Sequence, residues 1–118
     1  MDNILATVKQ GLGIASDYTP FDDELLMLIN SVFYTLYQIG IGDKPFIVDS
    51  ESTWNEFYDD DGVISACKPY ASLKTKLLFD PPSNTVYIES YINELEARIR
   101  YATDKFDEDD LVLAHKGE

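Results

Sequence analysis

Histidine and cysteine are nearly absent from this chain of 118 residues, which has one of each, His115 and Cys67. Because the one histidine stands close to the C-terminus, we expect neither a Ser–His–Asp triad nor a His-based metal site. A single cysteine excludes an internal disulfide and is typical of a reducing compartment. Cys67 falls on the apolar face of an expected helix, so we interpret it as a core residue rather than a nucleophile.

Positive charge is also scarce, with 9 Lys and Arg against 22 Asp and Glu and a formal net charge of -13. This negative net charge excludes binding of nucleic acid phosphates or anionic lipid over most of the protein surface, since both need dense positive charge. The imbalance is uneven: residues 1–61 hold 12 acids and 2 bases, whereas residues 62–103 hold 4 acids and 5 bases. Unlike surfaces on one molecule permit head-to-tail association of copies, the contact that generates rings.

No hydrophobic run is long enough for a membrane span. The most apolar stretch, residues 25–41, is interrupted by Asn30, Ser31, Thr35 and Gln38 and is shorter than the ~20 apolar residues that a span requires. The first residues also lack the basic and apolar blocks of a signal peptide. We expect a buried helix here and no membrane partner.

Apolar periodicity predicts an all-α fold, a small four-helix bundle. The expected helices cover about residues 3–11, 20–39, 64–79 and 84–103, with an irregular segment between the second and third. In that segment we expect a short extended stretch at residues 46–48, then one or two helical turns capped by Ser52, with Trp54 and Phe57 inward. Residues 1–103 would form one helical domain.

Helix ends carry their own signals. Thr19 followed by Pro20 predicts the start of the second helix, with Thr19 as the capping residue. The run Phe79, Asp80, Pro81 and Pro82 should stop the third helix, because a residue before proline is pushed out of the helical region. We expect Pro69 in the first turn of that helix or at a kink in it. On the fourth helix, the exposed side should carry the ion pairs Glu94–Arg98 and Glu96–Arg100.

The last segment, residues 104–118, has 6 acids and 2 bases. Its short apolar patch, Leu111, Val112, Leu113 and Ala114, is too small to form a core. We therefore expect an extended acidic tail that is mobile alone and ordered by a partner, for which strand addition to a sheet edge is one route.

The candidate phosphate-binding and calcium-binding motifs lack the residues that such sites need at the required spacing. Gly11 to Gly13 and Gly40 to Gly42 lack the lysine and further glycine of a phosphate loop. For a calcium loop with Gly62 at its sixth position, the first and twelfth positions would be Phe57 and Lys68, and lysine cannot bind calcium. We interpret Asp59, Asp60 and Asp61 as a solvated turn, and expect no catalytic residue, metal or cofactor. Lys68, Lys74 and Lys76 form one basic cluster, which either pairs with a neighbouring copy or is simply solvated.

Taken together, the motifs resemble the head–tail connector (adaptor) family of long-tailed bacteriophages over roughly residues 4–103. The most specific element is the run from Tyr70 to Pro82 that ends Leu-Leu-Phe-Asp-Pro-Pro, followed by a helix with Glu94-Leu95-Glu96 and Arg98-Ile99. Further similar segments are Leu12-Gly13-Ile14, Asp17-Tyr18-Thr19, Phe21-Asp22, Ile29-Asn30-Ser31-Val32-Phe33, Gln38-Ile39-Gly40-Ile41-Gly42 and Thr53-Trp54. Ile99-Arg100-Tyr101 departs from the family's Trp-Arg-Leu-like ending, and the acidic tail is unusually strong.

The resemblance implies a structural virion protein and not an enzyme. Such proteins form a ring beneath the portal, extend the DNA channel and offer a surface to a further head-completion or tail protein, after assembly in the bacterial host cytoplasm. DNA passes through without specific binding, and the Leu111–Ala114 patch is the expected portal-docking element. Two alternatives stay open: an acidic inhibitor that mimics DNA, and a carboxylate-based hydrolase that uses Asp59, Asp60 or Asp61.

Overall fold

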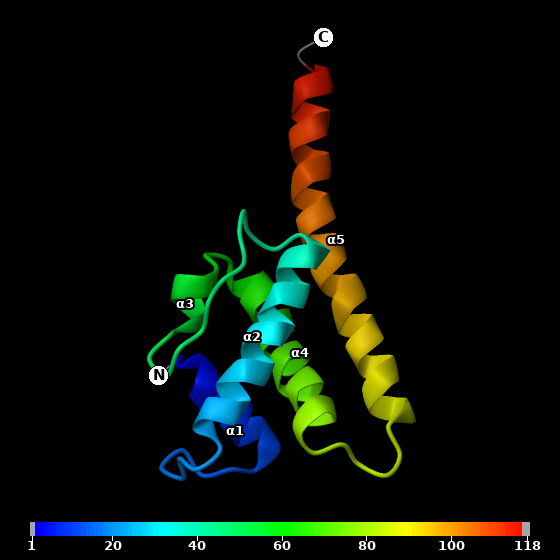
Figure 1. Cartoon of the computed structure of the whole chain (residues 1–118). Coiled ribbons are helices and arrows are strands. Elements are labelled where there is room, and N and C mark those ends of the chain that lie inside the picture. The colour runs from blue at the N-terminus through cyan, green and yellow to red at the C-terminus, as the bar shows by residue number, and fades with distance from the viewer. Residues whose placement is uncertain (1, 117–118) are drawn as a thin grey trace.

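Apart from one isolated bridge, all regular structure in the described residues is helical, as predicted. The computed structural model describes the backbone of residues 2–116 and the side chains of residues 2–102. In chain order the helices are α1 (Ile4–Leu12), α2 (Asp22–Ile39), α3 (Trp54–Phe57), α4 (Asp61–Phe79) and α5 (Val86–Lys116). Four of them are long and α3 is a single turn, so the described residues confirm the four-helix prediction (Figure 1).

The core is centred on α4, which packs against α1, α2 and α5. Apolar residues three or four positions apart give each helix one buried face. On α2 this face holds Leu25, Ile29, Val32 and Leu36, as the periodicity predicted. Buried apolar side chains of the other long helices include Ile4, Leu5 and Val8 of α1, Cys67, Tyr70 and Ala71 of α4, and Ile92, Leu95 and Ile99 of α5.

The irregular segment between α2 and α4 is held down by side chains and by one antiparallel bridge, Asn3 to Thr53, in which the Ile4 N–H donates to the Ser52 carbonyl and the Trp54 N–H to the Asp2 carbonyl. Residues 46–48 form no strand, and the side-chain amide of Asn30 binds both backbone groups of Val48. Trp54 is buried, as expected, and its indole N–H donates to the Thr7 hydroxyl at 3.0 Å. This contact joins α3 to α1 and places the segment over the N-terminal half of the bundle.

The prediction that Ser52 caps the short helix is wrong by one residue. Thr53 is the N-cap of α3, and with Glu56 it forms a reciprocal capping box. The Ser52 hydroxyl is engaged elsewhere, because it accepts from the Asp49 N–H and donates to the Asp49 carboxylate. A local hydrogen bond of this kind competes with capping and moves the helix start.

Two other helix starts also differ from expectation. α2 begins at Asp22, and its N-cap Phe21 makes no side-chain bond, so Thr19 does not cap this helix. α4 begins at Asp61, three residues early, since the Asp60 carboxylate accepts from the Val63 N–H. The run Asp59 to Asp61, interpreted from the sequence as a solvated turn, therefore contains the start of a helix. As a consequence Pro69 lies well inside α4 and not in its first turn.

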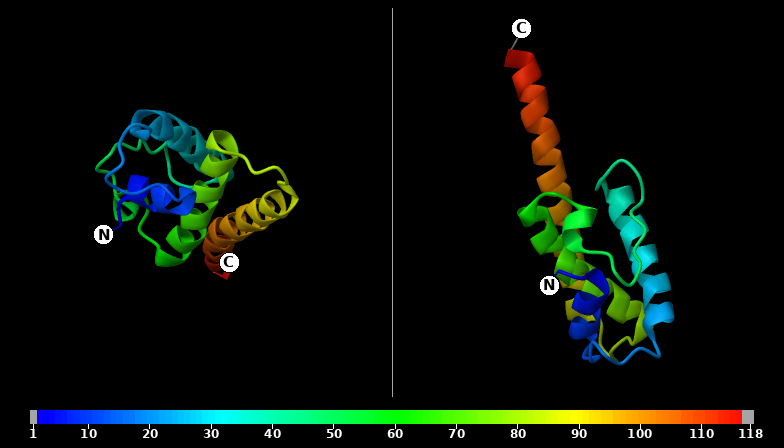
Figure 2. Two further views of the ribbon diagram at one scale, coloured as in Figure 1. Left: turned by 90° about the horizontal axis from the view of Figure 1, so that it is seen from below. Right: turned by 90° about the vertical axis from the view of Figure 1, so that its left-hand side faces the viewer.

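The stop at the double proline is confirmed. α4 ends at Phe79, and the N–H of Asp80 donates to the carbonyl of Lys76 at 2.8 Å. The last helix, in contrast, continues past the expected end near residue 103 and reaches Lys116. Its C-terminal half projects beyond the other helices, and the molecule is elongated, 58 × 32 × 20 Å (Figure 1, Figure 2).

Candidate interaction surfaces

The described residues contain no cluster of three or more His, Cys, Asp or Glu that could hold a metal ion. Asp60 is used as a helix cap, and Asp61 begins the same helix. Cys67 is fully buried, as predicted, and burial raises the pKa of its thiol to about 12. A thiol so far from ionisation is not a nucleophile at neutral pH.

The other perturbed groups also serve the fold. Burial and the hydrogen bond to Glu96 raise the pKa of the Tyr70 phenol above its ordinary range. Its hydroxyl donates to the Glu96 carboxylate at 2.8 Å, which fastens α5 to α4. Hydrogen bonds from the Glu51 N–H and the Ser52 hydroxyl lower the pKa of Asp49. None of these three groups lines the hollows described below.

The three lysines of the basic cluster lie on α4 and are only half-buried. Lys68 pairs with Asp2 at 3.1 Å, in an exposed ion pair. At 3.6 residues per turn, Lys74 and Lys76 project from different sides of the helix. The three side chains therefore do not form one compact patch, and only Lys68 lies on the groove described next.

An open groove runs along the outer face of α4, between α1 and α5. Two adjoining hollows of about 400 and 250 Å³ make it up, and Pro69 and Tyr91 line both. The floor consists of small side chains, which let another element approach closely. The remaining lining residues are Thr7, Gln10, Gly11, Lys68, Ser72 and Leu73 in the first hollow, and Gly62, Ser65, Ala66, Leu95, Arg98 and Ala102 in the second.

A second surface is the outer face of α2. Met27 is 75% exposed and Tyr34 is 50% exposed, one heptad apart on the same side of the helix. Asp23 and Glu24 lie at the beginning of the same face and are exposed. Exposed large apolar side chains that repeat at helical spacing mark a candidate contact surface.

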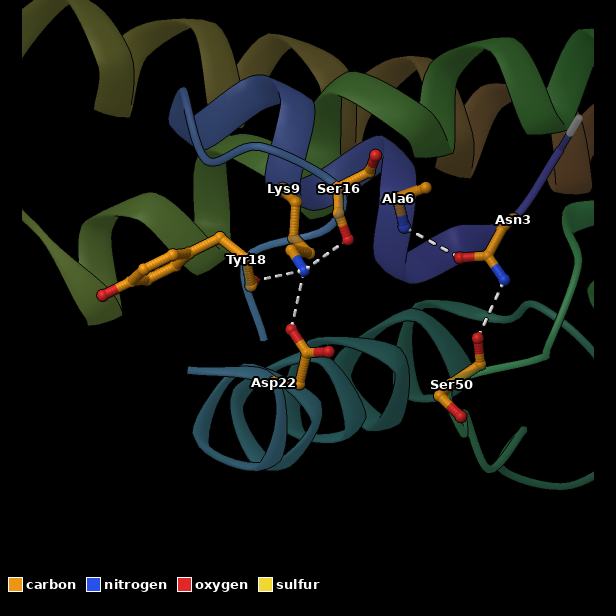
Figure 3. Close-up of polar contacts among 7 residues, drawn as sticks. All are labelled: Asn3, Ala6, Lys9, Ser16, Tyr18, Asp22 and Ser50. Atoms are coloured by element: carbon orange, nitrogen blue, oxygen red, sulfur yellow. Dashed lines mark hydrogen bonds and ion pairs between the residues drawn. The ribbon is translucent and has the colours of Figure 1, made fainter. Parts of the chain in front are cut away.

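Sequence reasoning missed the buried lysine of α1. Lys9 is 2% exposed, and its ammonium donates to the carbonyls of Ser16 and Tyr18 and to the carboxylate of Asp22 (Figure 3). The burial of Lys9 could have been inferred from its position, because it stands four residues after Leu5 and so lies on the apolar face of the helix. The lysine fixes the loop between α1 and α2 to both helices.

The Phe79-Asp80-Pro81-Pro82 motif has a packing role as well as a stop role. The ring of Phe79 meets the ring of Phe21 edge-on, with centroids 5.3 Å apart. The end of α4 is therefore attached to the beginning of α2. Of the predicted ion pairs on α5, Glu94–Arg98 is present. Glu96 also accepts a hydrogen bond from Tyr70, and its pairing with Arg100 stays a prediction.

The side chains of the expected docking patch, Leu111 to Ala114, lie outside the described side chains, as does that of His115. The backbone over these residues is helical and continues α5. Docking as an added strand would therefore require this part of the helix to unwind.

No helix in the described part of the chain is both long and apolar enough to cross a bilayer.

Comparison with known proteins gives one family. No curated protein and no solved structure matches the chain. A family model described as phage connector protein matches residues 4–106. This match covers α1 to α4 and α5 as far as residue 106. The chain therefore belongs to the phage connector protein family.

Proposed function

We propose that this protein assembles as a ring beneath the portal of a bacteriophage head, extends the DNA channel and joins head to tail. The observation that carries the proposal is the family match over residues 4–106, because connector proteins are structural components of the head–tail junction. Within the ring, copies would contact one another, and the exposed surfaces would meet the portal on one side and a further head-completion or tail protein on the other.

The charge of the chain supports passage of DNA without binding. With 22 acids against 9 bases, a channel wall built from these copies would repel phosphates rather than hold them. A conduit has to release DNA, whereas a DNA-binding ring would slow it. The same acidity permits the DNA-mimic alternative, but that alternative does not account for the connector family match.

The apolar patch of residues 111–114 is the proposed portal-docking element. It follows the acidic run of residues 107–110 and stands at the far end of α5, away from the bundle. An apolar patch at the end of a projecting segment can reach a neighbouring protein without disturbing the core. Docking would then depend on Leu111 and Leu113 and not on the packing of the bundle.

Binding to portal-bearing heads tests the proposal. The full chain, mixed with purified portal rings and with empty heads, should appear by electron microscopy as ring density at the portal vertex. The variant with Leu111→Asp and Leu113→Asp should lose this binding and keep the circular dichroism of the parent. The Lys116→Ala variant is the control in the same segment and should bind normally. Capture by a basic DNA-binding protein, with no binding to heads, would favour the DNA-mimic alternative.

A further inference from the structure

The groove on α4 and the outer face of α2 lie on opposite sides of the molecule. The side chains of α4 that face the core, such as Cys67 and Ala71, point away from Ser65 and Pro69, which line the groove. On α2, the buried side chains face α4 and Met27 faces outward. α4 therefore lies between α2 and the groove, so the two surfaces of one copy cannot contact each other.

The two surfaces match in shape and in polarity. The α2 face presents a convex row that includes Met27 and Tyr34, both large and exposed. Half of the residues that line the groove are Gly, Ser, Ala or Pro, and its large apolar lining residues are Leu73, Tyr91 and Leu95. Large apolar side chains that enter a hollow lined by small residues produce the close packing typical of interface centres.

Charge favours the same pairing. Lys68 lies at the rim of one hollow and Arg98 at the rim of the other, and both side chains are substantially exposed. Asp23 and Glu24 begin the α2 face. Both cations already have partners, Asp2 and Glu94, in exposed ion pairs that contribute little stability and can rearrange. An incoming acidic helix start would compete with Asp2 and Glu94 for these two cations.

We propose that the outer face of α2 in one copy docks into the α4 groove of the next copy. This inference rests on the proposed ring and names the surfaces that would build it. The contact is heterologous, because each copy offers its α2 face on one side and its groove on the other. Contacts of this type repeat from copy to copy and close into a ring when the rotation between copies allows it.

Cysteine cross-linking on assembled rings tests the pairing. The natural Cys67 is buried and will not react. Single variants M27C and Y34C place a thiol on the α2 face, and S65C and S72C place one in the groove. When an α2 variant and a groove variant are mixed and assembled on heads, mild oxidation should give a dimer that contains one of each. A chain with both cysteines should give a ladder of multimers.

Ile47 supplies a matched control, since it is 74% exposed, nearly the same as Met27, but lies outside both surfaces. The Met27→Asp variant should reduce ring assembly at least about tenfold, as expected for a central interface residue. Ile47→Asp should assemble as the parent does, and I47C should not cross-link to S65C or S72C.

The outcomes separate this inference from the proposed function. Rings that form normally with Met27→Asp, and that cross-link through none of the four pairs, would overturn the α2–groove contact and leave the ring itself in place. Failure of the parent chain to form rings on heads at any concentration would overturn the proposed function, and the contact would fall with it.

Discussion

The ammonium of Lys9 lies 2.8 Å from the carboxylate of Asp22, and the lysine side chain is almost completely buried. The pair links the last turn of α1 to the first residue of α2. Two backbone carbonyls from the connecting loop complete the donor set of the lysine. A buried charge is tolerated only when it is paired and hydrogen-bonded, and here three acceptors satisfy it.

Removing this lysine should destabilise the protein strongly. The Lys9→Ala variant leaves the Asp22 carboxylate without its cation, leaves two carbonyls without a donor, and opens a cavity beside α1. We expect a loss of about 2–4 kcal/mol in the free energy of unfolding, measured by urea denaturation.

Lys68→Ala is the matched control for that measurement. Its ion pair with Asp2 is exposed, so its removal should change the free energy of unfolding by less than about 1 kcal/mol. Equal effects of the two substitutions would show that the buried pair has no special role.

The contact between α1 and α4 leaves no room for a side chain at Gly11. A Cβ at this position would lie 2.8 Å from the Cβ of Ser72, closer than real Cβ contacts. We predict that Gly11→Ala lowers the free energy of unfolding, although alanine favours a helix by about 1 kcal/mol over glycine.

The double variant Gly11→Ala with Ser72→Gly tests whether steric contact is the cause. Its lost stability should be partly restored relative to Gly11→Ala, once the helix cost of about 1 kcal/mol for glycine at position 72 is allowed for. Strictly additive effects of the two substitutions would contradict the steric explanation.

Periodicity was sufficient to predict the four long helices, because each buries one apolar stripe that recurs every three or four residues. The stop before Pro81 and the core position of Cys67 followed from equally local chemistry. The helix starts were less predictable, since Ser52 and Thr53 both offer a capping hydroxyl, and the choice depends on the local hydrogen bond that engages Ser52 with Asp49.

The burial of Lys9, the groove and the arrangement of the basic cluster depend on tertiary structure. The burial of Lys9 required the carbonyls of a loop that no helical pattern describes. The groove required α1, α4 and α5 to lie side by side, which local sequence does not specify. The basic cluster was named from proximity in sequence, whereas the fold leaves only Lys68 on the groove.

The amide of Asn30 should contribute measurably to the stability of the irregular segment. It accepts from the Val48 N–H at 2.7 Å and donates to the Val48 carbonyl at 3.0 Å. Asn30→Ala leaves both backbone groups without this partner, so we expect a loss of about 1–3 kcal/mol in the free energy of unfolding. Gln38→Ala, on the exposed side of the same helix, should have almost no effect. A neutral Asn30→Ala would show that the other contacts of the segment hold it in place without this amide.

Alkaline pH should destabilise the fold through Cys67. In the unfolded chain the thiol ionises near its ordinary pKa of 9.0, whereas burial raises the pKa in the folded protein to about 12. Between these values the folded state binds more protons, so stability is fully present below pH 9 and falls as pH rises, by at most about 1.4 kcal/mol per pH unit. Tyr70, whose pKa is also raised, should add to the decline at higher pH.

Denaturation under reducing conditions at pH 8 and at pH 10.5 checks this, with Cys67→Ala as the comparison. The variant will be less stable at both values, but its free energy of unfolding should fall less steeply between them. Parallel declines in the two proteins would contradict the role assigned to the thiol.

Cryo-electron microscopy of portal-bearing heads incubated with the full chain is the most direct test of a connector role. The account predicts a ring of added density, coaxial with the portal and open along the DNA path, on heads that lack it beforehand. Heads that remain unchanged at saturating concentrations of folded protein would contradict it.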